Sequence, residues 1–340
     1  MTILLAIFVF GFLIFIHEGG HYIAARLCGV TVDEFSIGFG PKLISWISKK
    51  HGTRFSLRLL PIGGYVRMPG ENDETDDPNG FCKKSVPKRM LIIVMGALMN
   101  LLFGFLLMIA LVFLQKTLVS TRVAEFNDNA VSCEQIMVDD EILKIGRIRV
   151  HTGNEVLYEI ADQGDEPVDV TVRRNGEKLV LKDVSFGHIQ ESGVVFGDLD
   201  FKMYRDTESF GNYLKHSFWR SVSTVKMIYD SLFHLLTGRY GIEAVSGPIG
   251  VTEAVSDAAK SGWESMLYFI SVIAINLGLF NLLPFPALDG GQFVFLAIEG
   301  VRGKPVSKTI QNYITMAGLC LLFAFMAIIS VKDIIRLFIR

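Results

Sequence analysis

The chain has 340 residues, of which 50% are hydrophobic and only 20% are charged, so its composition is not that of an ordinary soluble protein. The formal net charge of −2 gives no reason to expect nucleic acid as a partner. The cysteines have no paired spacing, which argues against a disulfide framework and against a CxxC metal site. They are Cys28, Cys82, Cys133 and Cys320.

Four apolar segments are long enough to cross a bilayer, which requires roughly 17–25 residues in a helix. We predict membrane-spanning helices at 1–26, 90–115, 265–291 and 314–338. The first segment has no basic region before it and no small-residue cleavage site before Arg26. We therefore expect it to stay attached rather than to act as a removable signal peptide.

Basic residues in the short loops predict the orientation of these spans. The loop 27–89 is rich in lysine and arginine, and the loop 292–313 adds Arg302, Lys304 and Lys308. Both loops should therefore be cytoplasmic, which places both termini and the long region between the second and third spans outside. Three basic residues in the C-terminal tail oppose this assignment but are outnumbered.

The motif His17-Glu18-Gly19-Gly20-His21 matches the H-E-x-x-H pattern of zinc hydrolases. Residues four apart share one face of a helix, so His17 and His21 can direct both imidazoles at one ion. Glu18 lies one step round the helix, placed to take a proton from a metal-bound water. Such polar groups cost free energy in lipid, which argues against a chance match. We interpret the two glycines as allowing close packing of a neighbouring backbone or of a peptide.

A second polar site lies at the end of the third predicted span, where Pro284 and Pro286 should break the helix just before Asp289. A carboxylate there is a natural third ligand for a catalytic zinc ion, whose fourth position stays open. At 1.5 Å per residue, His17 lies about 24 Å from Met1, and Asp289 lies roughly 33 Å from Leu267. Both positions then fall toward the cytoplasmic side, where the two sites can meet.

The loop between the first two spans carries a hairpin pattern at about residues 53–68. Residues 54–60 alternate in part, and residues 61–64 supply turn chemistry. The segment is apolar enough to dip into the membrane beside the polar motif. We therefore predict a cytoplasmic-side, membrane-associated β-hairpin.

The chain becomes more polar over residues 117–186, with strand-like stretches at 141–145, 168–172 and 178–181 and a turn at Asn175-Gly176. The stretch 139–146 resembles the G-D-x-I-L motif of PDZ domains, without its first glycine. We expect an inserted extracytoplasmic PDZ-like α+β domain, with a generic small α+β domain as the alternative.

An extracytoplasmic linker follows at 187–264, in which residues 209–237 repeat apolar side chains every three to four positions. This pattern predicts an amphipathic helix. The helix either lies on the outer membrane surface or packs against the preceding domain, and the sequence leaves both alternatives open.

Together these motifs resemble the site-2 protease family of intramembrane zinc metalloproteases, in its bacterial RseP-like branch, here with a single PDZ domain. The resemblance rests on the motif 17–21 and on the segment 281–291, and the stretches 34–41, 59–66 and 246–250 support it. It implies a polytopic α-helical membrane protein with four transmembrane helices, a hairpin on the cytoplasmic side and an inserted PDZ-like domain.

The resemblance also implies roles for individual residues. His17, His21 and Asp289 would bind Zn²⁺, and Glu18 would activate water. A substrate segment would pair with the hairpin strand and be held by the break in the third span. The residues expected to contact the substrate are Asn281, Pro284, Pro286, Gly63 and Gly64.

We therefore expect a multi-pass zinc endopeptidase of the bacterial plasma membrane, with its active site toward the cytoplasmic side. It would perform regulated intramembrane proteolysis on single-span substrates in the lipid bilayer, such as trimmed anti-sigma factors or remnant signal peptides. The main alternative is a membrane metal transporter or sensor that uses the same His/His/Asp site, although the ionisable residues concentrate in one place. An inactive scaffold and another membrane zincin are further alternatives.

Overall fold

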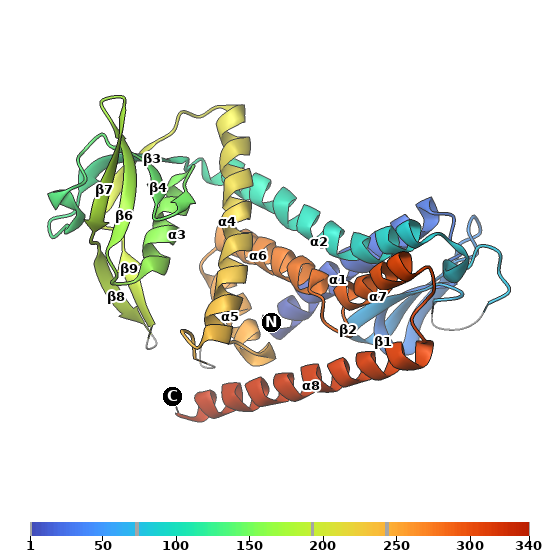
Figure 1. Cartoon of the computed structure of the whole chain (residues 1–340). Coiled ribbons are helices and arrows are strands. Elements are labelled where there is room, and N and C mark those ends of the chain that lie inside the picture. Colours follow the sequence, from blue (N-terminus) through green and yellow to red (C-terminus); the bar gives the residue numbers. More distant parts are fainter. Residues whose placement is uncertain (1, 72–74, 192–193, 242–244, 340) are drawn as a thin grey trace. The chain divides into compact units, whose positions relative to one another are not determined.

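The structure, a computed structural model of the chain, describes residues 2–71, 75–191, 194–241 and 245–339 (Figure 1). The chain divides into two compact units. The first unit comprises residues 1–104 and 246–340, and the second comprises residues 105–245. Helix α2 contributes its first part to the first unit and its last part to the second.

Within the described residues, four helices are long and apolar enough to cross a membrane. They are α1 (Thr2–Leu27), α2 (Val86–Gln115), α6 (Trp263–Leu282) and α8 (Lys308–Ile339). Even α6, with 20 residues, is about 30 Å long at 1.5 Å per residue, which equals the thickness of the hydrocarbon core. The predicted class of a multi-pass helical membrane protein is confirmed at this level.

The third of these helices ends earlier than predicted. Helix α6 stops at Leu282 because Leu283 adopts an extended backbone (φ −61°, ψ 141°), as a residue before proline prefers, and Pro284 has no N–H to donate. Helix α7 (Asp289–Arg302) then begins after a turn. The predicted span 265–291 is therefore too long as one helix, and much of the predicted loop 292–313 is helical.

Strands β1 (Glu34–Ile47) and β2 (Arg54–Arg67) form a small sheet in the first unit. Ile37 pairs with both Leu57 and Gly64, so the start of β1 lies between the two halves of β2. The predicted hairpin at 53–68 is wrong in this respect, because β1 separates the strands that were expected to pair. Long strands can fold back in this way where glycines accept positive φ, as Gly38 does at 84°.

A buried carboxylate ties these strands together. Glu34 of β1 accepts hydrogen bonds from Ser56 Oγ (2.8 Å) and from Arg58 Nη2 (2.9 Å) of β2, and it lies 3.2 Å from Lys42 Nζ. Burial alone would raise the pKa of Glu34, but these donors lower it to about 2. The charged carboxylate therefore holds the sheet in place at neutral pH.

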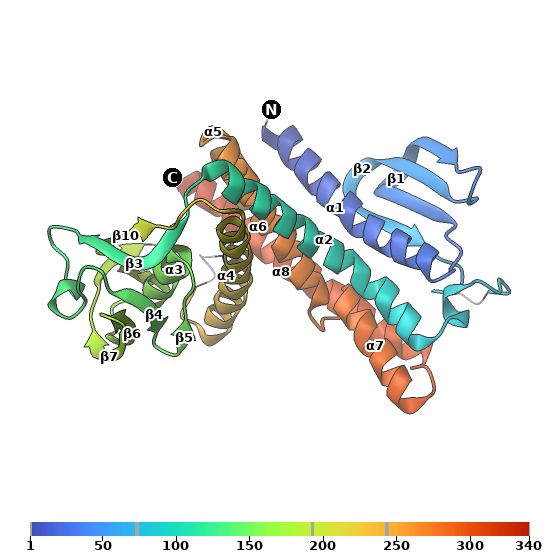
Figure 2. The ribbon, with the colours of Figure 1, turned by 90° about the horizontal axis from the view of Figure 1, so that it is seen from above.

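Small residues let the membrane helices of the first unit approach closely, and α1 and α2 run side by side (Figure 2). A Cβ at Gly20 would overlap the backbone carbonyl of Met95 on α2, which agrees with the expected role of this glycine. Gly19 has open space around its Cβ position, so no described backbone packs against it, and the approach of a peptide there stays a prediction. Ser271 Oγ of α6 also donates to the carbonyl of Gly104 (2.7 Å).

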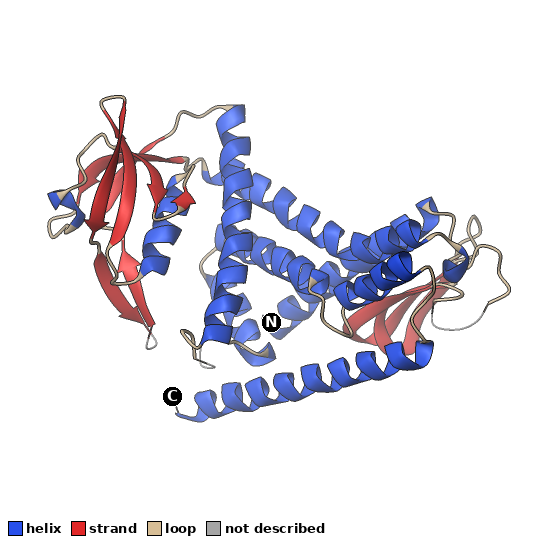
Figure 3. Ribbon diagram, viewed as in Figure 1, coloured by secondary structure: helices blue, strands red, loops and turns tan. Residues whose placement is uncertain are grey.

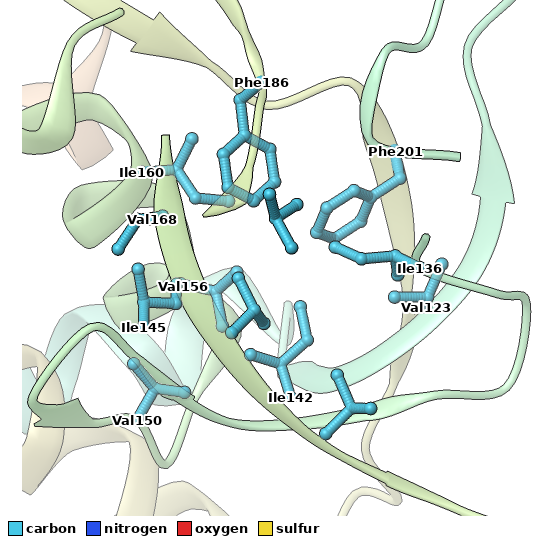
Figure 4. Close-up of a cluster of buried hydrophobic side chains, with 13 residues drawn as sticks. Val123, Ile136, Ile142, Ile145, Val150, Val156, Ile160, Val168, Phe186 and Phe201 are labelled. Atoms are coloured by element: carbon cyan, nitrogen blue, oxygen red, sulfur yellow. The ribbon is translucent and has the colours of Figure 1, made fainter. Parts of the chain in front are cut away.

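The second unit contains a sheet, whose strands are drawn red in Figure 3. Its strand order is β10-β3-β4-β6-β7, and the short β5 (Ile148–Arg149) pairs with β4. Helix α3 (Gly153–Gln163) supplies Val156 and Ile160 to the apolar cluster on one side of the sheet (Figure 4). The predicted strands correspond to three of its members. The long strands are β3 (Val119–Phe126), β4 (Glu141–Ile145), β6 (Val168–Arg174), β7 (Glu177–Val184) and β10 (Phe201–Arg205).

This domain extends beyond its predicted end at residue 186. Strand β10 pairs with β3, and its Phe201 is buried in the cluster (2% exposed). Strands β8 (Gly187–Glu191) and β9 (Val194–Asp198) also pair within the segment predicted as a linker. Sequence spacing could not show this, because the return of β10 to β3 is a long-range contact.

Helix α4 (Phe210–Thr237) covers nearly the segment predicted as amphipathic, beginning after an N-cap at Ser209. Its polar side contacts α3: Lys226 Nζ lies 3.0 Å from Glu159, and His234 Nε2 lies 2.9 Å from Asp162. Its apolar side is exposed: Phe233, for example, is 63% exposed. The helix therefore packs against the domain through polar side chains and leaves its apolar stripe open. Helix α5 (Pro248–Lys260) follows and belongs to the first unit.

Candidate metal centre

Two histidines from α1 begin the site. His17 and His21 are one turn apart, and their Nε2 atoms are 3.2 Å from each other. Their side chains are 12% and 10% exposed, so both rings lie largely within the first unit. A Cβ at Gly96 of α2 would overlap the ring of His21, which shows how closely α2 covers it.

The turn between α6 and α7 brings a carboxylate to these rings. Ala287 adopts a positive φ of 78°, which is uncommon for a residue with a side chain. A Cβ at Gly290 or Gly291 would overlap carbonyl oxygens of the turn itself. This tight folding holds Asp289 in the first turn of α7, with its Oδ2 3.2 Å from His17 Nε2 and 3.4 Å from His21 Nε2.

The three separations fit a zinc ion. Ligand atoms that lie 2.0–2.2 Å from a tetrahedral zinc ion are about 3.3–3.6 Å apart. The observed distances between the two Nε2 atoms and Asp289 Oδ2 are 3.2, 3.2 and 3.4 Å. The three atoms could therefore occupy three corners of one coordination tetrahedron and leave the fourth corner open.

Hydrogen bonding around the rings also points to a cation. His21 Nδ1 lies 2.9 Å from the carbonyl of Ile92, so this nitrogen carries a proton, and in the neutral ring Nε2 then has the lone pair. Asp289 Oδ2 is buried and has no hydrogen-bond partner among the described residues. Lone pairs on Nε2 and on a carboxylate cannot satisfy each other, whereas a cation between them would satisfy both.

Asn100 of α2 is a site residue that the sequence reasoning missed. Its amide nitrogen lies 3.4 Å from His17 Nδ1, and its Oδ1 is buried without a hydrogen-bond partner among the described residues. Turning the amide over would let Oδ1 accept the Nδ1–H of His17 and so leave Nε2 free for a metal. The sequence signal for Asn100 was that it is a polar residue within a long apolar segment.

Replacing Asn100 by Leu should weaken zinc binding about 10- to 100-fold, because the Nδ1–H of His17 would lose its acceptor. The measurement is zinc affinity by competition with a chromophoric chelator. Asn276→Leu removes another buried asparagine amide of the first unit and should leave zinc affinity unchanged. Equal zinc affinities for all three proteins would contradict a role for Asn100 in orienting His17.

Glu18 lies between the ligands in the sequence and is 9% exposed. A Cβ at Gly64 of β2 would lie 2.8 Å from Glu18 Cγ and 2.9 Å from the carbonyl of Ser36. The sheet therefore lies directly against Glu18, and only glycine allows this approach at position 64. The geometry places a carboxylate beside the metal centre at the edge of a β-strand.

The other residues predicted to contact substrate also lie in the first unit. Asn281 is in the last turn of α6, and Pro284 and Pro286 lie in the turn that precedes Asp289. Gly318 of α8 packs closely on Pro286. Gly63 has a positive φ of 84° and lies against the ring of Phe39.

Glu71, which follows β2, is a further carboxyl group that the sequence did not single out. Burial raises the pKa of Glu71 to about 7, His21 lowers it, and Asp289 and Glu18 add to the rise. These influences place Glu71 within electrostatic reach of the metal centre. No sequence motif marks Glu71, and it comes close to the metal centre because the chain continues past β2 in that direction.

Two histidines and a carboxylate that can share one ion, beside a glutamate and among helices apolar enough for a bilayer, define a membrane metallohydrolase. Comparison of the whole sequence with known proteins identifies the family. The chain belongs to peptidase family M50, the site-2 protease family, whose sequence model matches residues 5–325. The protein is a zinc metalloendopeptidase and a multi-pass plasma-membrane protein.

The chain is similar to bacterial relatives along their whole length. It is 35% identical to a putative zinc metalloprotease of Fusobacterium nucleatum, with 99% of this chain and 100% of the relative covered. It is 33% identical to a putative zinc metalloprotease of Clostridium acetobutylicum (98% and 97% covered). It is 26% identical to the regulator of sigma-W protease RasP of Bacillus subtilis (99% of each covered).

Proposed function

We propose that this protein performs regulated intramembrane proteolysis, cutting a peptide bond within or at the edge of a single-span substrate helix. The convergence of His17, His21 and Asp289, with their ligand atoms no more than 3.4 Å apart, carries this proposal. The site lies among helices apolar enough to cross a membrane, where a substrate helix can reach it.

The side chains of the site divide the chemistry between them. Zn²⁺ held by His17, His21 and Asp289 supplies Lewis-acid activation of water near neutral pH. Glu18 stays outside the ligand set, so its carboxylate accepts the proton of the attacking water and returns it to the leaving amide nitrogen. The buried setting of Glu18 keeps competing water away from this transfer.

The second half of β2 is the proposed docking edge for substrate. Residues 34–37 pair with one side of this strand, and no described strand pairs with its other side. An extended substrate segment that adds there would form backbone hydrogen bonds and lose its helical structure. Its peptide bond would then lie beside Glu18, which touches Gly64. Asn281, Pro284 and Pro286, in and after the last turn of α6, would help to hold it.

The substrates that we propose are membrane-anchored anti-sigma factors already trimmed by another protease, or remnant signal peptides. The relative from Bacillus subtilis is named for regulating sigma-W, which supports the first class. The basic residues of the segments 27–89 and 292–313 support an orientation with the active site toward the cytoplasm and with both termini and the domain of the second unit outside.

Co-expression with a panel of tagged single-span proteins tests the proposed function. The wild-type protein should convert full-length substrate into products whose new termini, read by mass spectrometry, fall inside or next to the span. The Glu18→Gln protein should leave the same substrates intact. A metal transporter or sensor, the alternative for this site, would yield no such products from any member of the panel.

The domain of the second unit is proposed to exclude substrates with bulky ectodomains. Asp206 N donates to the carbonyl of Leu118 (2.7 Å), so the chain enters and leaves the domain at adjacent points. A short Gly/Ser linker can therefore replace residues 119–205, a wider excision than the predicted domain 117–186 would have suggested.

We expect this excised protein to cleave untrimmed substrates about as fast as trimmed ones. The measurement is the ratio of the two cleavage rates, with the wild-type protein and an excised Glu18→Gln protein as controls. An unchanged preference for trimmed substrates in the excised protein would contradict the filter.

A further inference from the structure

The second unit contains a large basic pocket that the proteolytic site does not use. Its volume is about 920 Å³. At β6 it lies on the sheet face opposite the apolar cluster: Thr171 and Arg173 line the pocket, whereas the alternating Val170 and Val172 are buried in the cluster. The pocket meets the cluster at Val150, which belongs to both. The pocket is therefore a separate feature of this domain rather than a gap in its core.

The charge of the pocket lining is strongly unbalanced. Seven lysines and arginines line it against two acidic residues, Glu141 and Asp206. Glu141 pairs with Arg173, and Asp206 lies near Lys215 (3.8 Å) and His216. Four of the basic residues have no ion-pair partner among the residues that the structure describes. They are Lys144, Arg149, Lys178 and Arg205. Such a concentration of unpaired positive charge favours an anionic ligand.

The pocket lies next to the end of a membrane-spanning helix in the same unit. Asp206, which lines the pocket, is bonded through its N–H to Leu118, three residues beyond the end of α2. Lys215, also in the lining, is on α4, which is fastened to α2 by a hydrogen bond from Arg220 to Gln115 (2.9 Å). Because a spanning helix ends at the level of the lipid headgroups, the pocket lies near that level.

Helix α4 adds an apolar surface beside this charge. Phe210, Leu214 and Phe218 are spaced four residues apart and are 69%, 38% and 50% exposed. Exposed apolar side chains next to basic ones on an amphipathic helix are typical of a helix at the membrane interface. Val180 and Leu143 also line the pocket, so its surface is not purely polar.

We propose that this pocket binds the phosphodiester headgroup of an anionic phospholipid, with the acyl chains directed toward the apolar stripe of α4. An acidic peptide would match the positive charge alone. A phospholipid matches the charge, the neighbouring apolar stripe and the position at the end of α2 together. Lipid binding in this pocket requires neither the metal centre nor proteolysis, so this proposal does not depend on the proposed function.

The test uses the full-length protein in mixed micelles that contain phosphatidylglycerol or phosphatidylcholine, with bound lipid counted by native mass spectrometry. The pocket variant carries Lys144→Gln, Arg149→Gln and Lys178→Gln. The control variant carries Lys182→Gln, Lys202→Gln and Lys260→Gln, three exposed lysines outside the pocket, and has the same net charge. A Glu18→Gln protein tests whether binding depends on proteolysis.

We expect the wild-type, control and Glu18→Gln proteins to retain phosphatidylglycerol in preference to phosphatidylcholine. The pocket variant should bind phosphatidylglycerol on the order of a hundred-fold more weakly, since each basic residue near an anionic surface contributes about five-fold. Unchanged phosphatidylglycerol binding by the pocket variant would overturn the proposal. A wild-type protein that shows no preference between the lipids, but binds a polyglutamate peptide or inorganic phosphate in this pocket, would overturn it equally.

Discussion

A Glu18→Gln protein should bind zinc as well as the wild type does and should hydrolyse peptide bonds about 10²- to 10⁴-fold more slowly. Glutamine has nearly the same size as glutamate, so the close contact with Gly64 and the packing of β2 are preserved. Its amide cannot accept the proton of the attacking water. The measurements are single-turnover cleavage of a purified single-span substrate in micelles and zinc content by atomic emission.

A Glu18→Asp protein provides the matched comparison. It keeps the charge but draws the carboxylate back by one methylene, so its cleavage rate should fall between those of the wild-type and Glu18→Gln proteins. Loss of zinc from the Glu18→Gln protein would show that Glu18 is a metal ligand. An unchanged cleavage rate with zinc bound would require a different base.

An Asp289→Asn protein should bind zinc more than about a hundred-fold more weakly. This loss of zinc affinity is larger than the 10- to 100-fold typical of substituting a residue that only hydrogen-bonds to a metal ligand. Its cleavage activity should disappear with the metal. The amide keeps the size of the side chain but removes the charge that balances the cation, and Asp289 Oδ2 has no other described partner. The measurement is zinc affinity by chelator competition, with cleavage followed at each zinc concentration.

Asp333→Asn is the control, because Asp333 is another buried carboxylate of the first unit. It accepts backbone hydrogen bonds from Gly247 (2.9 Å) and Gly250 (3.1 Å) and so fastens the start of α5 to α8. This substitution should lower thermal stability but leave zinc affinity unchanged. If Asp289→Asn and Asp333→Asn lower zinc affinity equally, the loss reflects general destabilisation, and Asp289 is not a ligand.

Much of the site could be predicted because its signals are local. The four-residue spacing of His17 and His21 specifies one helix face wherever the helix lies. Pro284 and Pro286 mark the break before Asp289 without any knowledge of neighbours. Asn100 stood out only as a polar residue in an apolar segment, and its contact with His17 depends on how α2 packs on α1. Glu71 carried no local signal, since the fold of the chain after β2 brings it within electrostatic reach of the metal centre.

By itself, the sequence determined the number of candidate membrane helices, the H-E-x-x-H face and the strands with clear alternation, such as Val168–Arg174. These features depend on intrinsic conformational preference and on apolar periodicity, which act over a few residues. Only the tertiary structure decided which distant segments pair. It placed β1 between the halves of β2, returned β10 to β3, and brought Asp289 within 3.4 Å of both imidazoles. Such contacts depend on shape and burial across the whole chain, which local patterns do not record.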